Sequence, residues 1–257
     1  MIKQFHYVLN RMALFTAMVI AVVLYFNAEF MQIATANIWL NGVIIGTTIF
    51  GIGLCFVHLF KLLPEYRWLG GYIGGKRNIS APPYLLHPVA QILAAHTRHI
   101  SESTLDSISD IILTRMEDSR ASIQYITNIL VFLGLLGTFW GLILTVGGFA
   151  ELISSLNFSD ESVLQSMQAG ISKPLSGMTT AFTSSLLGLA GSLIVGFLGM
   201  QMQIAQNNLF RHVLDFLASR TSGTAGDTIA RVLPKINLAT HELTKSIQTL
   251  EQTLSDA

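Results

Sequence analysis

The chain has 257 residues, of which 51% are hydrophobic and only 12% are charged. A soluble domain usually carries about 25% charged residues, so this composition excludes an ordinary soluble protein. The formal net charge is zero, which gives no indication of a nucleic-acid partner. Cys55 is the single cysteine, so an intrachain disulfide and a zinc site built from cysteines are both excluded.

Long apolar runs predict four membrane-spanning helices, at about residues 12–26, 38–60, 127–150 and 174–202. The last two easily provide the roughly 20 apolar residues that cross a hydrocarbon core about 30 Å thick. The first is short, but Phe5, Tyr7 and Val8 can extend it while Arg11 reaches toward the headgroups. The expected fold class is an all-α membrane protein with a cytoplasmic helical middle loop and a helical C-terminal tail.

The distribution of basic residues predicts the orientation. They gather before the first span, between the second and third, and after the fourth: Lys3, Arg11, Lys61, Arg67, Lys76, Arg77, Arg98, Arg115, Arg120, Arg211, Arg220, Arg231, Lys235 and Lys245. The two remaining loops carry acidic residues, with Lys173 as their only base. By the positive-inside rule, both termini and the middle segment are cytoplasmic.

An alternative for the N-terminus stays open. The basic start, the apolar run and the small residues Ala34 to Ala36 also loosely match a secretory signal peptide. Cleavage there would leave three spans and an outside N-terminus, with the last two spans unaltered.

Apolar residues recur at helical spacing from Val89 to Ile123. This pattern predicts a helical hairpin, or one long helix that runs into the third span. Because no clear carboxylate or cysteine partner accompanies His87, His96 and His99, we expect these side chains to face solvent rather than to bind a metal.

The tail has apolar residues at alternating gaps of four and three, which is typical of a coiled-coil seam. The seam consists of Ile229, Leu233, Ile236, Thr240, Leu243, Ile247, Leu250 and Leu254. It predicts either a self-associating tail or one amphipathic helix packed on the cytoplasmic base. The expected segments are thus a helix pair (1–60), a cytoplasmic loop (61–123), a two-helix core (124–210) and the tail (211–257).

Small and polar residues form stripes in the last two spans. The third span has one stripe, of Gly134, Thr138, Gly141, Thr145 and Gly148. The fourth span has two: Gly177, Ala181, Ser184, Gly188 and Gly191, and then Ser185, Ser192, Gly196 and Gly199. Such faces let helix backbones approach closely in lipid. Pro174 suits the first turn of the fourth helix.

The hydroxyls of Thr138, Thr145, Ser184 and Ser185 could relay protons through water, but none titrates near neutral pH. A proton-conducting path normally includes an intramembrane carboxylate, and the predicted spans contain none. Either the stripes serve packing alone, or another subunit brings the acid.

Two segments, LGLLGTFWGLILT and AFTSSLLGLAGSL, resemble the signatures of the MotA/TolQ/ExbB proton-channel family, approximately GLxGTVxG and ALxATAxGLxxAI. Matches to the first are Gly134, Leu135, Gly137, Thr138 and Gly141; those in register with the second are Ala181, Ser184, Ser185, Gly188 and Leu189. Ser185 stands where the family usually has threonine, and Ser184 replaces an alanine. Further departures are Phe182, Leu186 and Ser192. The resemblance covers about residues 120–220.

The resemblance implies an inner-membrane subunit of a bacterium, assembled as a homopentamer around two copies of a single-span partner. That partner would carry the essential intramembrane aspartate, and its periplasmic part would reach the cell wall or an outer-membrane protein. Thr138 and Ser185 would face the aspartate, and Thr145 and Ser184 would line the path with them. Packing around the pore would involve Gly134, Gly137, Gly141, Gly148, Gly177, Ala181, Gly188, Gly191 and Pro174. The cargo would be H+, with Na+ as the alternative, and no cofactor is expected.

The four-span layout with a large middle loop is more similar to MotA than to ExbB or TolQ. The coiled-coil-like tail is not expected of a flagellar stator, so another energised envelope system with a peptidoglycan-binding partner fits as well. A non-conducting membrane scaffold is the rival hypothesis. An enzyme is not expected, because no helix pairs a histidine with a carboxylate at membrane depth.

Overall fold

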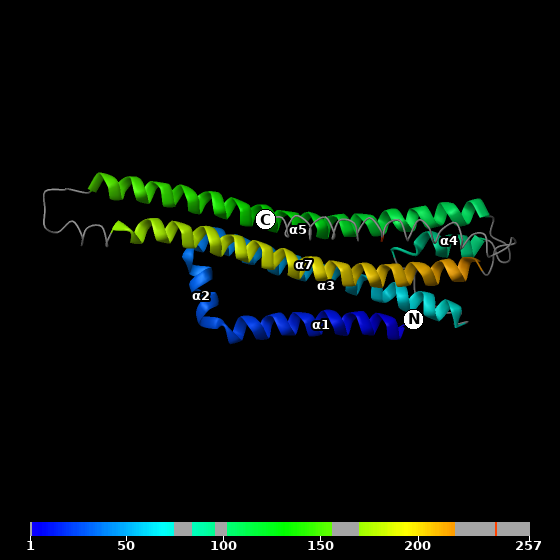
Figure 1. Cartoon of the computed structure of the whole chain (residues 1–257). Coiled ribbons are helices and arrows are strands. Elements are labelled where there is room, and N and C mark those ends of the chain that lie inside the picture. Colours follow the sequence, from blue (N-terminus) through cyan, green and yellow to red (C-terminus); the bar gives the residue numbers. More distant parts are fainter. Residues whose placement is uncertain (1, 75–83, 96–101, 156–169, 219–239, 241–257) are drawn as a thin grey trace. The chain divides into compact units, whose positions relative to one another are not determined.

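The computed structural model describes residues 2–74, 84–95, 102–155, 170–218 and 240 (Figure 1). Within these ranges the chain is helical and contains no strand. The helices are α1 (Ile2–Tyr25), α2 (Asn27–Ala36), α3 (Ile38–Ile73), α4 (His87–Ala95), α5 (Glu102–Ser155) and α7 (Ser172–Ala218). Four of them, α1, α3, α5 and α7, are long and apolar enough to cross a membrane. The predicted all-α class and the four candidate spans are therefore confirmed.

Three of these helices extend well beyond the apolar runs that predicted them. Helix α3 continues to Ile73 through Pro64, α5 begins at Glu102, and α7 ends at Ala218. Of the segment predicted before the third span, residues 89–93 lie in the separate short helix α4, and the residues from Leu105 onward lie in α5, which runs into the third span. The extensions form because amphipathic sequence continues the helix after the apolar run ends. The predicted seam of the tail lies outside the described residues except for Thr240, as do His96 and His99.

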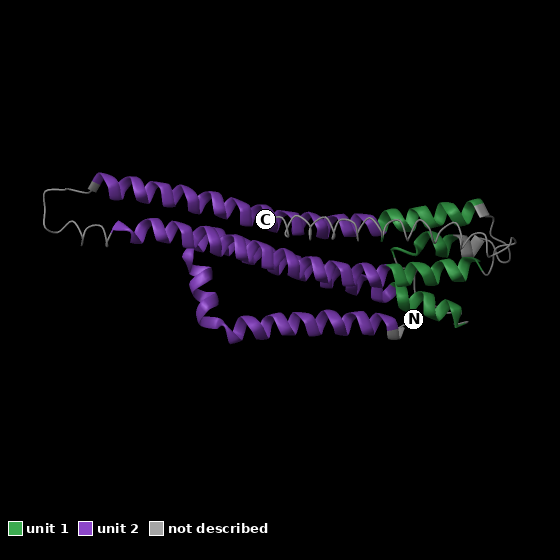
Figure 2. Cartoon of the chain, viewed as in Figure 1, with its two compact units in different colours: residues 1, 65–115, 207–257 green, residues 2–64, 116–206 purple. Residues whose placement is uncertain are grey.

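The chain divides into two compact units (Figure 2). Among the described residues, unit 1 comprises 65–74, 84–95, 102–115, 207–218 and 240, and unit 2 comprises 2–64, 116–155 and 170–206. Helices α3, α5 and α7 contribute residues to both. Unit 2 holds the apolar segments, and unit 1 holds the ends of the helices together with α4.

Unit 1 has a core of its own, built from four helices. Its buried side chains include Tyr66 and Leu69 of α3, Leu86 and Val89 at α4, Leu105, Ile108 and Ile112 of α5, and Leu209, Phe210, Val213 and Leu217 of α7. Tyr72 stacks on Trp68 and meets Phe216 edge-on. Burial of this much apolar surface makes unit 1 resemble the core of a water-soluble bundle.

Two charged residues hold the start of α4 in unit 1. The Glu65 carboxylate accepts hydrogen bonds from the backbone N–H groups of Leu85 (2.8 Å) and Leu86 (3.1 Å). These two N–H groups directly precede α4, which begins at His87, so the carboxylate from α3 provides hydrogen-bond acceptors at the start of that helix. The Arg115 guanidinium donates to the Tyr84 carbonyl and lies over the Tyr84 ring.

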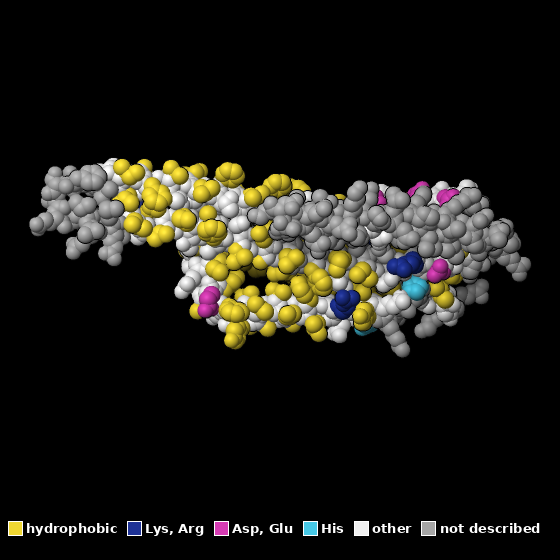
Figure 3. Space-filling model, in the orientation of Figure 1, with side chains coloured by type: hydrophobic (Ala, Val, Ile, Leu, Met, Phe, Trp, Pro, Cys, Tyr) yellow, Lys and Arg dark blue, Asp and Glu magenta, His cyan; other side chains and the backbone are white. Residues whose placement is uncertain are grey.

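Unit 2 presents a largely apolar surface. Exposed large side chains include Leu14, Met18 and Leu24 of α1 and Phe132, Phe139, Trp140, Ile143 and Val146 of α5. Figure 3 shows hydrophobic side chains spread over the visible parts of α1 and α5. A surface of this kind meets lipid or other apolar helices rather than water.

Candidate functional site

Helices α5 and α7 pack with their backbones in direct contact. A Cβ atom added at Gly188 would lie 2.7 Å from the Cα of Gly134, and one added at Gly141 would lie 2.6 Å from the carbonyl oxygen of Gly177. Real Cβ atoms essentially never come closer than 3.0 Å to such neighbours. Glycine is therefore required for the observed approach, as in other close helix pairs in membranes.

The contact continues to one end of the antiparallel pair, where Gly148 meets Pro174. A Cβ at Gly148 would lie 2.8 Å from the Pro174 nitrogen. The Thr145 hydroxyl, which is buried, lies 2.8 Å from the carbonyl oxygen of Gly141 and 3.3 Å from that of Pro174. The Thr145 hydroxyl therefore lies within hydrogen-bond distance of a carbonyl oxygen on each of the two helices. Beyond this point an exposed ion pair joins Lys173 to Glu151.

Helix α3 covers one side of the α5–α7 pair. A Cβ added at Gly137 would overlap Ser184 and lie 3.1 Å from the Leu40 side chain, and one added at Gly191 would overlap Thr48. These contacts show that Gly137 of α5 and Gly191 of α7 both turn toward α3.

A buried polar contact reinforces this side. The Ser184 hydroxyl donates to Asn41 Oδ1 at 2.6 Å, and Asn41 Nδ2 donates to the Ile33 carbonyl of α2 at 2.7 Å. Both Ser184 and Asn41 have no exposed surface. Because a buried carboxamide without partners would be strongly destabilising, these bonds fix the arrangement of α2, α3 and α7.

Thr138 and Ser185 lie on the side of the pair that faces away from α3. Successive residues of a helix are rotated by about 100°, so Thr138 turns away from the direction of Gly137, and Ser185 turns away from that of Ser184. A Cβ on Gly134 would lie 3.5 Å from the Cα of Ser185, and Thr138 follows Gly134 by one turn. Both residues are half-buried. The two hydroxyl residues therefore sit at a similar level, on the same side.

In the stripe of α5, Thr138 is half-buried, whereas Gly137, which the resemblance places among the packing residues, is buried. The Thr138 hydroxyl donates to its own helix at the Leu135 carbonyl (2.7 Å). Positions three and four residues apart lie almost equally near a helix face. The approach of α3, which spacing alone cannot reveal, brings Gly137 into the contact.

The first stripe of α7 lies in contacts with other helices, and the second does so only in part. Pro174, Gly177, Ala181 and Gly188 face α5, and Gly191 faces α3. In the second stripe, the Ser192 hydroxyl bonds to the Leu189 carbonyl of its own helix, and a Cβ on Gly199 would lie 2.8 Å from the Ile123 side chain. This stripe extends the α5–α7 contact toward the charged end of unit 2.

Asn41 is the site residue that the sequence analysis missed. A carboxamide near the start of an apolar run is itself a signal, because polar side chains in membrane spans usually have a partner or a function. Its partner Ser184 lies 143 residues away in the sequence, so no local pattern connects the two.

Family models, curated proteins and solved structures contain no match to this chain. The functional interpretation therefore rests on the two motifs and on the geometry of the α5–α7 pair.

Proposed function

We propose that the chain is an inner-membrane proton-channel subunit similar to the MotA/TolQ/ExbB family. Five copies surround two copies of a single-span partner that carries an intramembrane aspartate, and proton flow past that aspartate drives mechanical work in the cell envelope. The path runs along the side of the α5–α7 pair that carries Thr138 and Ser185. By the positive-inside rule, the basic residues that flank the spans place both termini in the cytoplasm.

One observation carries this proposal. The apolar parts of α5 and α7 contain no charged residue, yet each places a hydroxyl residue at the same level on the side away from α3. The Thr138 hydroxyl bonds its own helix, and an acid on a neighbouring helix at this level would gain hydrogen-bond partners from both residues and access to water. A partner helix on this side would account both for the absence of an acid in these spans and for the position of the two half-buried hydroxyl residues.

The glycines have a supporting role in this proposal. They allow α5 and α7 to act as one rigid wall, because glycine lets their backbones touch over several turns. A rigid wall holds Thr138 and Ser185 in fixed positions relative to each other. Preorganised hydroxyls of this kind assist proton transfer without further rearrangement.

The test is proton flux in lipid vesicles that contain the full chain and a single-span protein, encoded beside it, with an aspartate in its apolar segment. We expect Thr138→Val and Ser185→Ala each to reduce the flux at least tenfold, because each removes a hydroxyl from the path. Flux without the partner should remain at the level of empty vesicles.

Thr183→Val is the matched control. Thr183 lies in α7 two residues from Ser185, on a different face of the helix, and its hydroxyl bonds to the Thr179 carbonyl of its own helix (2.8 Å). Its substitution should leave the flux unchanged. Normal flux in both the Thr138 and Ser185 variants would contradict the assignment of the path.

A non-conducting scaffold is the second candidate, and one observation favours it. The hydroxyls of Thr145 and Ser184, two of the four candidate path residues, are occupied in contacts between helices. A scaffold would use the small stripes for packing and its tail to recruit partners. Absence of flux with every candidate partner, together with stable co-purification of one of them, would support the scaffold.

A further inference from the structure

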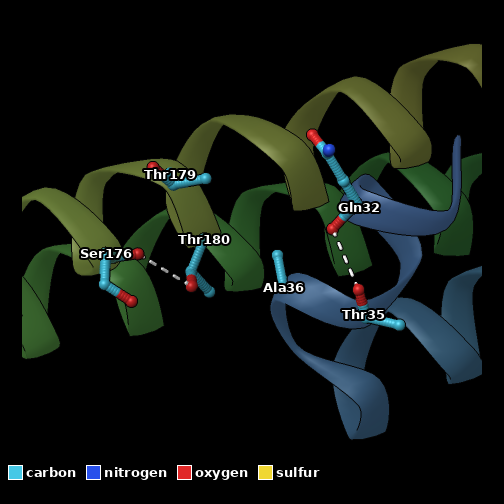
Figure 4. A pocket seen from close by; sticks show the side chains of 6 residues that line it. All are labelled: Gln32, Thr35, Ala36, Ser176, Thr179 and Thr180. Carbon is cyan, nitrogen blue, oxygen red and sulfur yellow. Dashed lines mark hydrogen bonds between the residues drawn. The ribbon is translucent and has the colours of Figure 1, made fainter. Parts of the chain in front are cut away.

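A hollow of about 390 Å³ lies between α2 and α7 within unit 2 (Figure 4). Its lining consists of Gln32, Thr35 and Ala36 of α2 and Ser176, Thr179 and Thr180 of α7. Four of these six residues carry hydroxyls, one carries a carboxamide, and none is charged. A space of this size and polarity holds on the order of ten water molecules, at about 30 Å³ each.

The helix on one side of this hollow is weakly anchored. Helix α2 has ten residues and none of them is buried. Both residues that flank it, Phe26 and Asn37, leave the helical conformation, with φ and ψ of −95° and 36° for Phe26 and −147° and 94° for Asn37. A short helix between two such joints can move as a unit.

One hydrogen bond fastens α2 to its neighbours. Among the described residues, the bond from Asn41 Nδ2 to the Ile33 carbonyl is the only side-chain hydrogen bond between α2 and another helix. The Ser184 hydroxyl holds Asn41 Oδ1 and so directs the amide nitrogen toward Ile33. These two hydrogen bonds therefore link α2 to α3 and α3 to α7, and α7 forms the other wall of the hollow.

From these observations we infer that α2 is a hinged cover over a hydrated, hydroxyl-lined site on α7, and that Asn41 is its latch. With the latch formed, α2 restricts exchange of water with Thr180, which is only 3% exposed. When the latch breaks, α2 turns about Phe26 and Asn37, and water reaches this part of α7 freely. Only the further step, in which this water supplies ions to the channel, rests on the proposed function.

The inference is tested by the rate at which a small water-soluble methanethiosulfonate reagent labels Thr180→Cys. The full-length chain is used in lipid nanodiscs, with Cys55 replaced by alanine so that one thiol is present. We expect slow labelling when Asn41 is intact and at least tenfold faster labelling in Asn41→Leu, which removes both bonds and keeps a similar side-chain volume. Thr179→Cys, whose position is already exposed, should react rapidly with either residue at position 41.

Two further variants separate a released cover from a misfolded chain. Thr48→Val alters another α3 residue, which contacts Gly191 of α7 and bonds the Ile44 carbonyl of its own helix, so the Thr180→Cys rate should stay low. Asn37→Gly loosens the joint and removes the cap on the Leu40 N–H (3.2 Å) while Asn41 remains, so the rate should rise. Fast labelling of Thr180→Cys in the parent, or equal rates in Asn41→Leu and Thr48→Val, would overturn the inference.

The labelling rate needs neither a partner nor ion flux. A chain that fails to conduct protons can still show a latched cover, and a conducting chain can lack one. The flux test uses Thr138 and Ser185, which do not line the hollow. Failure of the cover and failure of the proposed function are therefore distinguishable.

Discussion

Two buried carboxamides in unit 2 differ in how their polar atoms are satisfied. Asn41 uses both its oxygen and its nitrogen in hydrogen bonds to other helices. Gln201 of α7 is only 1% exposed, and neither its Oε1 nor its Nε2 has a partner among the described residues. An unsatisfied buried amide costs about 1–3 kcal/mol, so Gln201 is a local weak point of the isolated chain.

Gln201→Leu should therefore stabilise the purified chain by about 1–3 kcal/mol, because the unpaired amide is replaced by an apolar group of similar size. The measurement is the thermal unfolding midpoint in detergent. Gln206→Leu is the opposite case, since Gln206 accepts from Arg120 Nε (3.0 Å) and donates to Ser119 Oγ (2.7 Å). That variant should unfold at a lower temperature than the parent. A lower midpoint for Gln201→Leu would show instead that the amide is satisfied by bound water or by another chain.

At the scale of elements, the α5–α7 contact is set by glycine at particular positions. A Cβ added at Gly141 would lie 2.4 to 2.6 Å from three atoms of α7. One added at Gly147 would have no neighbour within 4 Å. The two glycines are six residues apart in the same helix. The same substitution at each therefore changes helix propensity equally, but it changes the packing only at Gly141.

Gly141→Val should weaken the α5–α7 pair by at least about 1–3 kcal/mol, the usual cost of overpacking, and Gly147→Val should have little effect. Unfolding midpoints of the two purified variants provide the comparison. Equal midpoints would mean that the backbones do not touch at Gly141.

The long helices were predictable because an uninterrupted apolar run of about 20 residues predicts a membrane-spanning helix, whether its side chains meet lipid or other helices. The apolar run around Gly134 to Gly148 is long enough to span, and no charge interrupts it. Helix α2 was not predicted: the segment between the first two spans reads as a loop, and its helix is held by Asn41 rather than by an apolar face. The contact of Gly137 with Leu40 was also not predictable from spacing, because it depends on α3 approaching from one side.

At the scale of the whole molecule, the exposed apolar surface of unit 2 is extensive. Phe132 is 69% exposed, Phe139 66% and Trp140 54%. Side chains of this size at regular intervals on α5 suit both lipid and the helices of other copies. The predicted seam of the tail gives a second reason to expect an oligomer.

Deletion of the chain after Arg220 tests the tail. We expect the truncated chain to insert into the membrane normally, because all four candidate spans precede that residue, but to form less stable assemblies. Native mass spectrometry from detergent micelles compares the two chains. Loss of insertion would assign the tail a different role, and an unchanged distribution of oligomers would exclude self-association through the seam.

The Glu151–Lys173 ion pair has a consequence for identifying the partner. It lies at the end of the α5–α7 pair that the positive-inside rule predicts to be outside, and distances along the proposed path can be counted from it. At 1.5 Å per residue, Thr138 lies about 20 Å below this ion pair, and Ser185 about 18 Å. Both depths fall inside a hydrocarbon layer about 30 Å thick. A genuine partner should then carry its aspartate about twelve or thirteen residues from the outer end of its own span, a criterion that can be applied to neighbouring genes before any protein is purified.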